Sequence, residues 1–229
     1  LFIFSIMKIK FVSITLFFLS AFLSEIFSQY PDSLVQALVN QTNPDTLSYY
    51  MNTLSGEDSV TINGQRHLIT SRYWSHFHND LAADFIDETL QKTGLPVTNQ
   101  YYSSGGRNVI ATQTGTTFSN QQFIICAHYD DMPSSPPAPG ADDNASGVAV
   151  LLELAKSLGK SFNASRPIIF AAFSGEEAGL IGSKYFVENY SSPSSVKFLA
   201  NLNFDTVGRL FENKLMILNG NTAREWKFI

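Results

Sequence analysis

The sequence predicts an α/β fold in which a mixed, mainly parallel sheet lies between helices on both of its faces. Three apolar stretches, at 123–127, 167–173 and 196–204, have the length and composition of buried strands, and helix-like stretches separate them. Strands that alternate with helices indicate a three-layer sandwich, because each parallel connection needs a crossover that covers one face of the sheet. The chain of 229 residues is long enough for one domain with a substantial core.

Turn residues and apolar periods divide the chain into its elements. Asn43-Pro44 separates the first two helices, and Gly94 ends the third, whose apolar side chains recur at helical spacing from Trp74 onward. A turn at 103–107 joins the first two strands, and the last two helices each begin just after an acidic turn that contains glycine. The expected helices span 33–40, 45–54, 72–93, 145–158 and 180–190, and the expected strands span 97–102, 108–112, 123–127, 167–173, 196–204 and 214–218.

Charge and cysteine content argue against two kinds of function. The formal net charge is −5 and Lys and Arg form no run, so no nucleic-acid partner is expected, because binding to phosphates needs a basic surface. The single cysteine, Cys126, cannot form a disulfide within the chain and lies in an apolar strand-like stretch. We therefore expect it to fill the core rather than to act as a nucleophile.

The first 28 residues have the features of a signal peptide. Met7 opens a short basic start, and the apolar stretch at 11–23 is short for a membrane span. The residues before Met7 are interpreted as read-through. The mature domain is then expected at 29–229, in a secreted or periplasmic protein without stable membrane insertion, with a membrane anchor as the alternative.

Acidic side chains follow the strand-like stretches at one expected edge of the sheet. His128 and Asp130 come directly after the stretch at 123–127, and Asp205 follows the stretch at 196–204. In open α/β sheets ligands bind at the carboxyl ends of the strands, so we expect these side chains to lie together. Two acidic pairs belong to the same edge: Asp142-Asp143, which opens the helix at 145–158, and Glu176-Glu177, which follows the strand at 167–173.

Taken singly, each of these groups has an ordinary structural explanation. Asp142 and Asp143 fit a helix cap. Glu176 and Glu177 fit the positive end of a helix dipole. Taken together, so many carboxylates cannot all stay ionised in one cleft without raised pKa values or a cation. Imidazole and carboxylate donors suit Zn²⁺ in a hydrolytic site, with Mn²⁺ or Co²⁺ as alternatives, and their number fits two ions better than one.

The combination of motifs resembles the secreted bacterial leucyl aminopeptidases, di-zinc exopeptidases related to glutamate carboxypeptidase. The resemblance implies a zinc exopeptidase-like fold and the removal of N-terminal amino acids from peptide substrates. It spans about residues 108–218, and its matching segments are 128–130, 139–147, 174–179 with Gly182-Ser183, and 203–208.

The resemblance also implies which residues bind the two ions. Asp142 would bridge them. His128 and Asp205 would complete one site, and Glu177 would bind the second ion.

Four further expectations concern residues at or next to these ligands. Glu176 would be the general base that takes a proton from water. Asp130 would orient His128. Asp143 would support the metal ligands without binding an ion itself. The family also implies a cis peptide bond between Asp142 and Asp143, which would aim Asp142 at both ions.

One feature of the sequence departs from the family pattern. The second metal site of the family needs a histidine from a loop after Asp205, and no histidine follows His128. We therefore expect the second site to lack its histidine in this chain, and the catalytic domain to be incomplete at its C-terminus. The other histidines, His67, His76 and His78, are expected to be structural or solvated.

Two rival functions stay open at this point. A glutaminyl cyclase would use a related fold with a single zinc ion, and a non-catalytic relative would serve as a peptidase-like binding domain. The pair Glu176-Glu177 argues against the second rival, because a site without catalysis has no need for both acids. Carboxypeptidase-type specificity is a further possibility.

Overall fold

The computed structural model describes residues 32–159, 162–190, 196–210, 212, 214 and 216. The predicted signal peptide and most of the predicted strand at 214–218 lie outside the described residues. The chain divides into two compact units, residues 1–42 and 43–229. The described part of the first unit holds helix α2 (Ser33–Val39), which Asp32 caps by accepting a hydrogen bond from the Leu34 amide.

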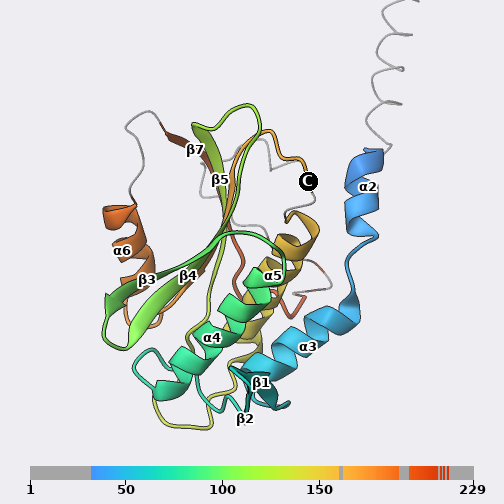
Figure 1. Cartoon of the computed structure of the whole chain (residues 1–229). Coiled ribbons are helices and arrows are strands. Elements are labelled where there is room, and N and C mark those ends of the chain that lie inside the picture. Colours follow the sequence, from blue (N-terminus) through green and yellow to red (C-terminus); the bar gives the residue numbers. More distant parts are fainter. Residues whose placement is uncertain are drawn as a thin grey trace, which may run out of the picture. The chain divides into compact units, whose positions relative to one another are not determined.

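The second unit is built around a five-stranded mixed sheet, as the sequence predicts. Its strand order is β3-β4-β6-β5-β7. Strand β5 pairs in parallel with β6 and β7, while β4 pairs antiparallel with β3 and β6, so β4 runs against the other four (Figure 1). The strands are β3 (Val97–Ser103), β4 (Gly106–Gln113), β5 (Gln121–His128), β6 (Ile168–Phe173) and β7 (Lys197–Asn203).

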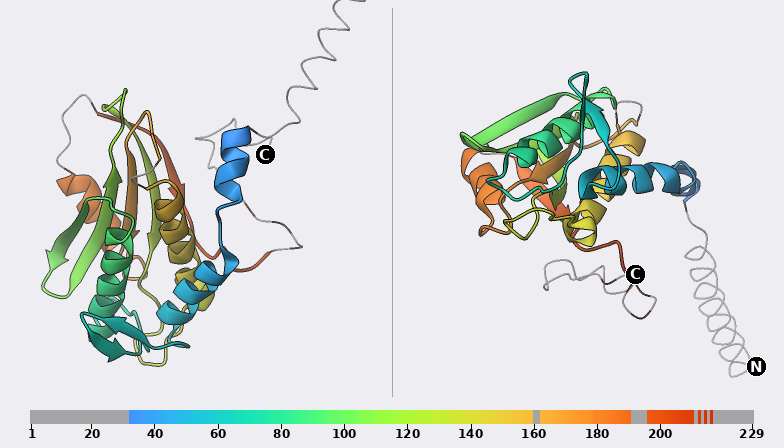
Figure 2. Two further views of the ribbon diagram at one scale, coloured as in Figure 1. Left: turned by 45° about the vertical axis from the view of Figure 1, so that its right-hand side comes forward. Right: turned by 90° about the horizontal axis from the view of Figure 1, so that it is seen from below.

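Helices cover both faces of this sheet, which confirms the predicted three-layer α/β fold. Helices α3 (Pro44–Ser55), α4 (Phe77–Gln91) and α5 (Gly147–Ser157) lie on one side, and α6 (Ile181–Asn189) lies on the other (Figures 1 and 2). Each residue of β6 is buried, because successive side chains of a strand point to opposite faces and both faces are covered. Ile168, Phe170 and Ala172 join the larger core, and Ile169, Ala171 and Phe173 join the smaller one.

A small hairpin that the sequence analysis did not predict precedes α4. Strands β1 (Val60–Ile62) and β2 (Gln65–His67) pair antiparallel across Asn63-Gly64. Both turn residues have positive φ, 50° and 76°, and the dipeptide Asn-Gly between short strands is a strong local signal for a tight hairpin. This signal was present in the sequence.

Two segments near the acidic edge differ from the predicted helices. Helix α4 begins at Phe77 rather than at residue 72, with His76 as its N-cap. An irregular turn, η1 (Ala141–Ser146), precedes α5, with non-helical backbone at Asp143 and Asn144. The non-proline cis bond lies between Asp143 and Asn144, so the predicted position between Asp142 and Asp143 is wrong by one residue.

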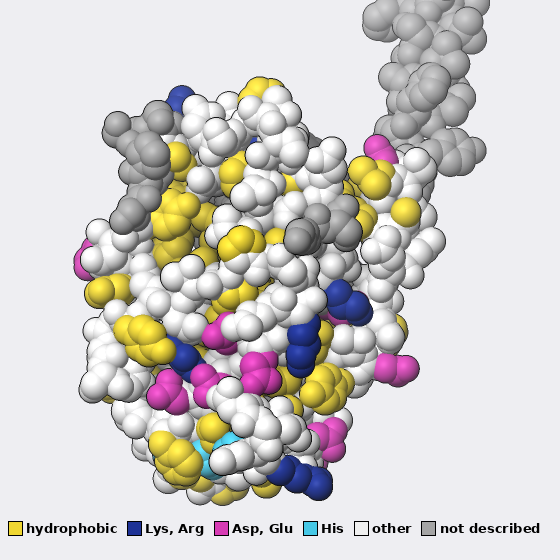
Figure 3. All heavy atoms as spheres, in the orientation of Figure 1, with side chains coloured by type: hydrophobic (Ala, Val, Ile, Leu, Met, Phe, Trp, Pro, Cys, Tyr) yellow, Lys and Arg dark blue, Asp and Glu magenta, His cyan; other side chains and the backbone are white. Residues whose placement is uncertain are grey.

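The surface of this unit carries mixed charge. On the face drawn in Figure 3, the described lysine and arginine side chains lie among acidic ones and form no continuous basic patch. Within the described ranges, no helix is both long and apolar enough to cross a membrane.

Candidate metal centre

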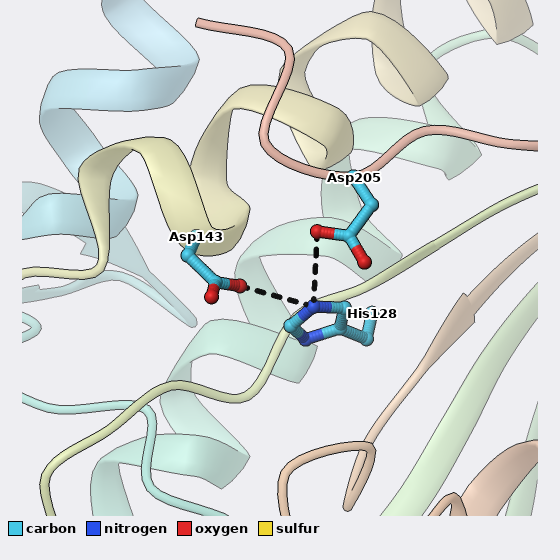
Figure 4. Close-up of side chains that lie close together, drawn as sticks. All are labelled: His128, Asp143 and Asp205. Carbon is cyan, nitrogen blue, oxygen red and sulfur yellow. Dashed lines mark ion pairs between the residues drawn. The ribbon is translucent and has the colours of Figure 1, made fainter. Parts of the chain in front are cut away.

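Three donor side chains meet at the carboxyl edge of the sheet. His128 is the last residue of β5, and Asp205 lies two residues after the end of β7. Because β5 and β7 are parallel neighbours, both residues reach the same edge. Asp143 approaches from η1, and one nitrogen of the imidazole faces both carboxylates (Figure 4). His128 Nε2 is 3.2 Å from Asp143 Oδ1 and 3.7 Å from Asp205 Oδ1, and the three donor atoms lie within 4.8 Å of one another.

Asn144 holds the two acidic segments side by side. It is fully buried, and its side-chain amide donates to the Phe204 carbonyl at 2.9 Å. Its side-chain oxygen accepts from the amides of Gly147 at 2.9 Å and Thr206 at 3.3 Å. Asp143 directly precedes Asn144, and Asp205 lies between Phe204 and Thr206. The contacts of Asn144 therefore hold the two carboxylates at a fixed spacing.

Asp130 connects His128 to the loop that carries the two glutamates. Its carboxylate is buried, and Oδ1 lies 3.6 Å from His128 Nδ1. The same carboxylate accepts the amides of Glu176 at 3.0 Å and Glu177 at 3.2 Å. His128 Nδ1 also lies 3.2 Å from the Asp130 carbonyl oxygen, so Nε2 is the ring nitrogen that faces outward.

Glu176 shares a cavity with two of the three donors. The cavity has a volume of about 240 Å³ and combines an apolar wall with polar groups. The side chain of Glu177 is exposed at the rim of this edge, whereas Glu176 is half-buried. The cavity is lined by Cys126, His128, Phe173, Glu176, Leu180, Ser183, Asn201, Asn203 and Asp205.

Asp142 does not join this cluster, which differs from the sequence prediction. Its Oδ1 accepts the Gly208 amide at 2.8 Å and lies 3.4 Å from the Ser146 hydroxyl. Its Oδ2 lies 3.7 Å from Nε of the exposed Arg209. Asp143 takes the position next to His128, because the non-helical backbone at Asp143 (φ −107°, ψ 95°) turns successive side chains in different directions.

Burial and nearby charges shift the pKa values of His128 and Glu177. Burial lowers the pKa of His128, but the hydrogen bond and charge of Asp130, with the charges of Asp205 and Glu176, outweigh it and raise that pKa to about 9. The pKa of Glu177 is raised, first by burial and then by the nearby negative charge of Asp143. The cluster therefore attracts positive charge, whether a proton or a metal ion.

The donor set fits a divalent metal ion such as zinc. One imidazole and two carboxylates are donors that zinc takes in catalytic sites, and Asp130 beside the other ring nitrogen is a common arrangement behind a metal-binding histidine. The remaining histidines stand apart, since among the described residues the three-donor cluster does not include them. His78 instead accepts the Thr70 amide through Nδ1 at 3.2 Å.

Sequence reasoning missed Arg72 and Asp131, which lie fully buried behind this cluster and form an ion pair at 3.3 Å. A signal for Asp131 was available. If the alternation of β5 continued past its last residue, His128, then Tyr129 and Asp131 would lie on the face opposite to His128 and Asp130. Both are fully buried. No local pattern marked Arg72.

The fold and the donor cluster together define a zinc exopeptidase-like α/β domain. A family model confirms this class: residues 108–228 match Peptidase family M28, and the chain belongs to that family.

Curated relatives support the same class. Aminopeptidase YwaD of Bacillus subtilis is 34% identical over 144 residues, covering 61% of this chain and 31% of that protein. A protein named probable zinc metalloprotease from Pyrenophora teres f. teres is 30% identical over 209 residues, covering 79% of this chain and 42% of that protein. The chain thus spans less than half the length of these relatives.

Solved structures share the fold. A leucine aminopeptidase precursor from Bacteroides thetaiotaomicron has a TM-score of 0.57 and 21% identity, covering 72% of this chain and 63% of that one. The glutaminyl cyclase of Porphyromonas gingivalis has a TM-score of 0.57 and 23% identity, covering 73% of this chain and 60% of that one. At these identities, the likeness concerns the fold alone.

Proposed function

We propose that the protein is a zinc-dependent aminopeptidase that releases N-terminal amino acids from peptides. The observation that carries this proposal is the convergence of His128, Asp143 and Asp205 beside Glu176. Membership of a peptidase family and similarity to a protein named an aminopeptidase support it.

We assign the metal ligands with one change from the sequence prediction. His128, Asp143 and Asp205 would hold one ion. Asp143 takes the bridging role first given to Asp142, because Asp143 lies 3.2 Å from His128 and its side chain is 53% exposed. Glu177, whose pKa responds to Asp143, would serve a second ion. The proposal includes two ions per complete domain and a second site that lacks its histidine ligand in this chain.

Glu176 is proposed as the general base. Bound zinc would lower the pKa of a coordinated water and polarise the scissile carbonyl. Glu176 lines the same cavity as His128 and Asp205, so its carboxylate is available to take a proton from water there. Its backbone amide is fixed by Asp130, which limits the positions that the side chain can reach. The resulting hydroxide would attack the scissile carbonyl carbon, and as the C–N bond breaks the protonated Glu176 would give its proton to the leaving amine.

The test is Glu176→Gln, which removes proton transfer and keeps the side-chain size. We expect kcat for an aminoacyl-anilide to fall by about 10²–10⁴-fold with zinc content unchanged. Glu188→Gln, on the exposed side of α6, is the matched control and should keep normal turnover. Near-normal turnover by Glu176→Gln would refute the assignment of the base.

A glutaminyl cyclase with one zinc ion is the second candidate. It is favoured by the single three-donor cluster within the described residues and by the fold shared with solved cyclases. Incubation with a peptide that begins with glutamine separates the two functions. A cyclase releases ammonia and keeps the peptide length, whereas an aminopeptidase releases a free amino acid. A non-catalytic binding domain would do neither.

Export is proposed on the sequence alone, as a secreted or periplasmic protein with residues 1–28 removed. Mass spectrometry of the N-terminus of the exported protein tests the proposed cleavage. A mature protein that retains residues 11–23 would favour the membrane-anchor alternative.

A further inference from the structure

Arg72 is a fully buried arginine that binds backbone carbonyls from three separate segments. Its Nε donates to the Tyr129 carbonyl at 2.7 Å, and Nη1 donates to the Leu54 carbonyl at the end of α3. Nη1 also donates to Pro139 at 3.0 Å, and Nη2 donates to Gly140 at 2.9 Å. The side chain therefore joins α3, the end of β5 and the entrance of η1.

Asp131 completes the contacts of Arg72 from the same side. It accepts the Arg72 amide at 2.8 Å and pairs with Nη1 at 3.3 Å. Neither side chain is exposed to solvent. Burial raises the pKa of the Asp131 carboxyl to about 6 even though the positive charge of Arg72 opposes this shift. A buried ion pair of this kind is costly to desolvate and is weak evidence for stability alone.

Three of the four carbonyls that Arg72 binds, those of Tyr129, Pro139 and Gly140, lie in segments that carry proposed metal ligands. Tyr129 lies between His128 and Asp130 in the chain. Gly140 is the N-cap of η1, three residues before Asp143, and its carbonyl accepts the Ala145 amide at 3.0 Å. One guanidinium thus fixes the distance between the strand end that carries the imidazole and the turn that carries the carboxylate.

The packing at Gly140 shows how closely Arg72 approaches this turn. A Cβ added at Gly140 would lie 2.7 Å from Arg72 Nη2 and 2.7 Å from Asp131 Cβ. Gly140 has φ 43°, where a side chain is also unfavourable. The turn at Gly140 therefore packs directly against the guanidinium, and a side chain at this position would clash with it.

A second connection runs from Arg72 to the glutamate loop. Asn79 donates to the Arg72 carbonyl at 2.7 Å, and the Ser174 hydroxyl donates to Asn79 Oδ1 at 3.1 Å. Ser174 is buried and lies two residues before Glu176. Arg72 is therefore connected directly to the segments that carry His128 and Asp143, and through Asn79 to the loop that carries the glutamates.

We propose that Arg72 is a positioning residue for the metal centre, with Asp131 as its partner. It acts by setting the separation of His128 and Asp143 through the backbone of the flanking loops. The inference rests on the proposed metal-dependent function. A lysine could keep the charge, but its ammonium cannot reproduce the planar fork that serves several carbonyls at once.

The test compares Arg72→Lys with Arg107→Lys. Arg107 is a matched control, since it is also buried, its side chain donates to a carbonyl (Asp80, 3.1 Å) and it pairs with Asp84. Its carbonyl accepts the Tyr129 hydroxyl at 2.7 Å, but this is a backbone contact that lysine keeps. In the metal-free protein we expect amide hydrogen exchange in segment 138–147 to speed up by about tenfold in Arg72→Lys and to stay unchanged in Arg107→Lys. The apparent Co²⁺ affinity, followed by visible absorption, should fall by about 10–100-fold in Arg72→Lys alone.

The two readouts separate this inference from the function on which it rests. If the unsubstituted protein binds no Co²⁺, the proposed metal function fails, while the exchange data still test Arg72. Equal exchange in the two lysine variants would overturn the positioning role. If Arg72→Lys does not fold, Asp131→Asn replaces it, because asparagine keeps the shape and can still accept the Arg72 amide. Unchanged exchange in segment 138–147 of Asp131→Asn would then overturn the proposal.

Discussion

Two layers of charged residues at the same edge of the sheet differ in how their charge is compensated. The inner layer, Arg72, Asp130 and Asp131, is fully buried, and each member binds protein groups. Asp143 and Asp205 form the outer layer; their side chains are 53% and 41% exposed, and Nε2 of His128 faces both of them. Buried charges must be satisfied by the fold itself, whereas the outer carboxylates converge and leave coordination positions for a ligand.

The adjacent residues Asp142 and Asp143 show the same contrast at the scale of one peptide bond. Asp142 accepts a backbone amide from Gly208 at 2.8 Å and so stabilises a loop. Asp143 faces His128 instead. Identical chemistry at neighbouring positions thus serves structure in one case and, we propose, metal binding in the other.

The largest effect is expected from removing charge in the outer layer. Asp143→Asn should weaken Zn²⁺ binding by more than about 100-fold. Even residues that only hydrogen-bond to a metal ligand contribute about 10–100-fold to metal affinity, and Asp143 is proposed as a ligand itself. Asp142→Asn is the matched control and should change zinc affinity by less than about tenfold. Competition with a chromophoric chelator measures both. The reverse order of the two variants would restore Asp142 as the ligand.

Substitution in the inner layer should have an intermediate effect. Asp130→Asn keeps the shape of the side chain but weakens its bonds to the amides of Glu176 and Glu177 and its support of His128. We expect zinc affinity to fall by about 10–100-fold. Calorimetric titration of zinc checks this value. Affinity equal to that of the unsubstituted protein would mean that Asp130 serves only the glutamate loop.

The pH dependence of the metal-free protein should follow His128. Its pKa is raised to about 9, above the ordinary value of about 6.5, so folding favours the protonated form. The stability it contributes is fully present below about pH 6.5 and is lost as the pH rises through about 9. Zinc needs the neutral imidazole, so the apparent zinc affinity should rise by about tenfold per pH unit between about 7 and 9.

Imidazole resonances from NMR give the measurement and its internal control. His78 should titrate below its ordinary range, because burial lowers the pKa of that ring, while His128 titrates above it. A His128 resonance that titrates near pH 6.5 in the metal-free protein would contradict the electrostatic description of the cluster.

The smallest effect is expected outside both layers. Asn43 caps α3 by accepting the Asp45 amide at 2.9 Å, far along the chain from the donors. Asn43→Ala should cost about 1 kcal/mol of unfolding free energy and leave zinc affinity unchanged. Urea unfolding together with the chelator assay tests both parts. A loss of zinc affinity here would show that metal binding responds to stability in general rather than to the two layers.

The sequence by itself determined the class of fold and the edge where chemistry gathers. Apolar runs such as 167–173 were recognisable because a strand buried on both faces has no polar alternation, and the structure places β6 there. His128 and Asp205 were found because each follows an apolar run, and parallel strands bring their carboxyl ends together. These are local patterns combined with one general rule of sheet topology. The prediction that the run before Asp205 is a buried strand was wrong, because β7 lies at the edge of the sheet and most of its side chains are exposed.

Tertiary structure alone decided which aspartate faces His128 and what lies behind it. The backbone at Asp143 and Asn144 is set by contacts with Phe204 and Thr206, about 60 residues later in the chain. Arg72 is likewise defined by carbonyls 18 to 68 residues away. Sequence periodicity carries no information about such contacts, because hydrogen bonds to distant backbone groups depend on where the loops meet and leave no local pattern at either residue.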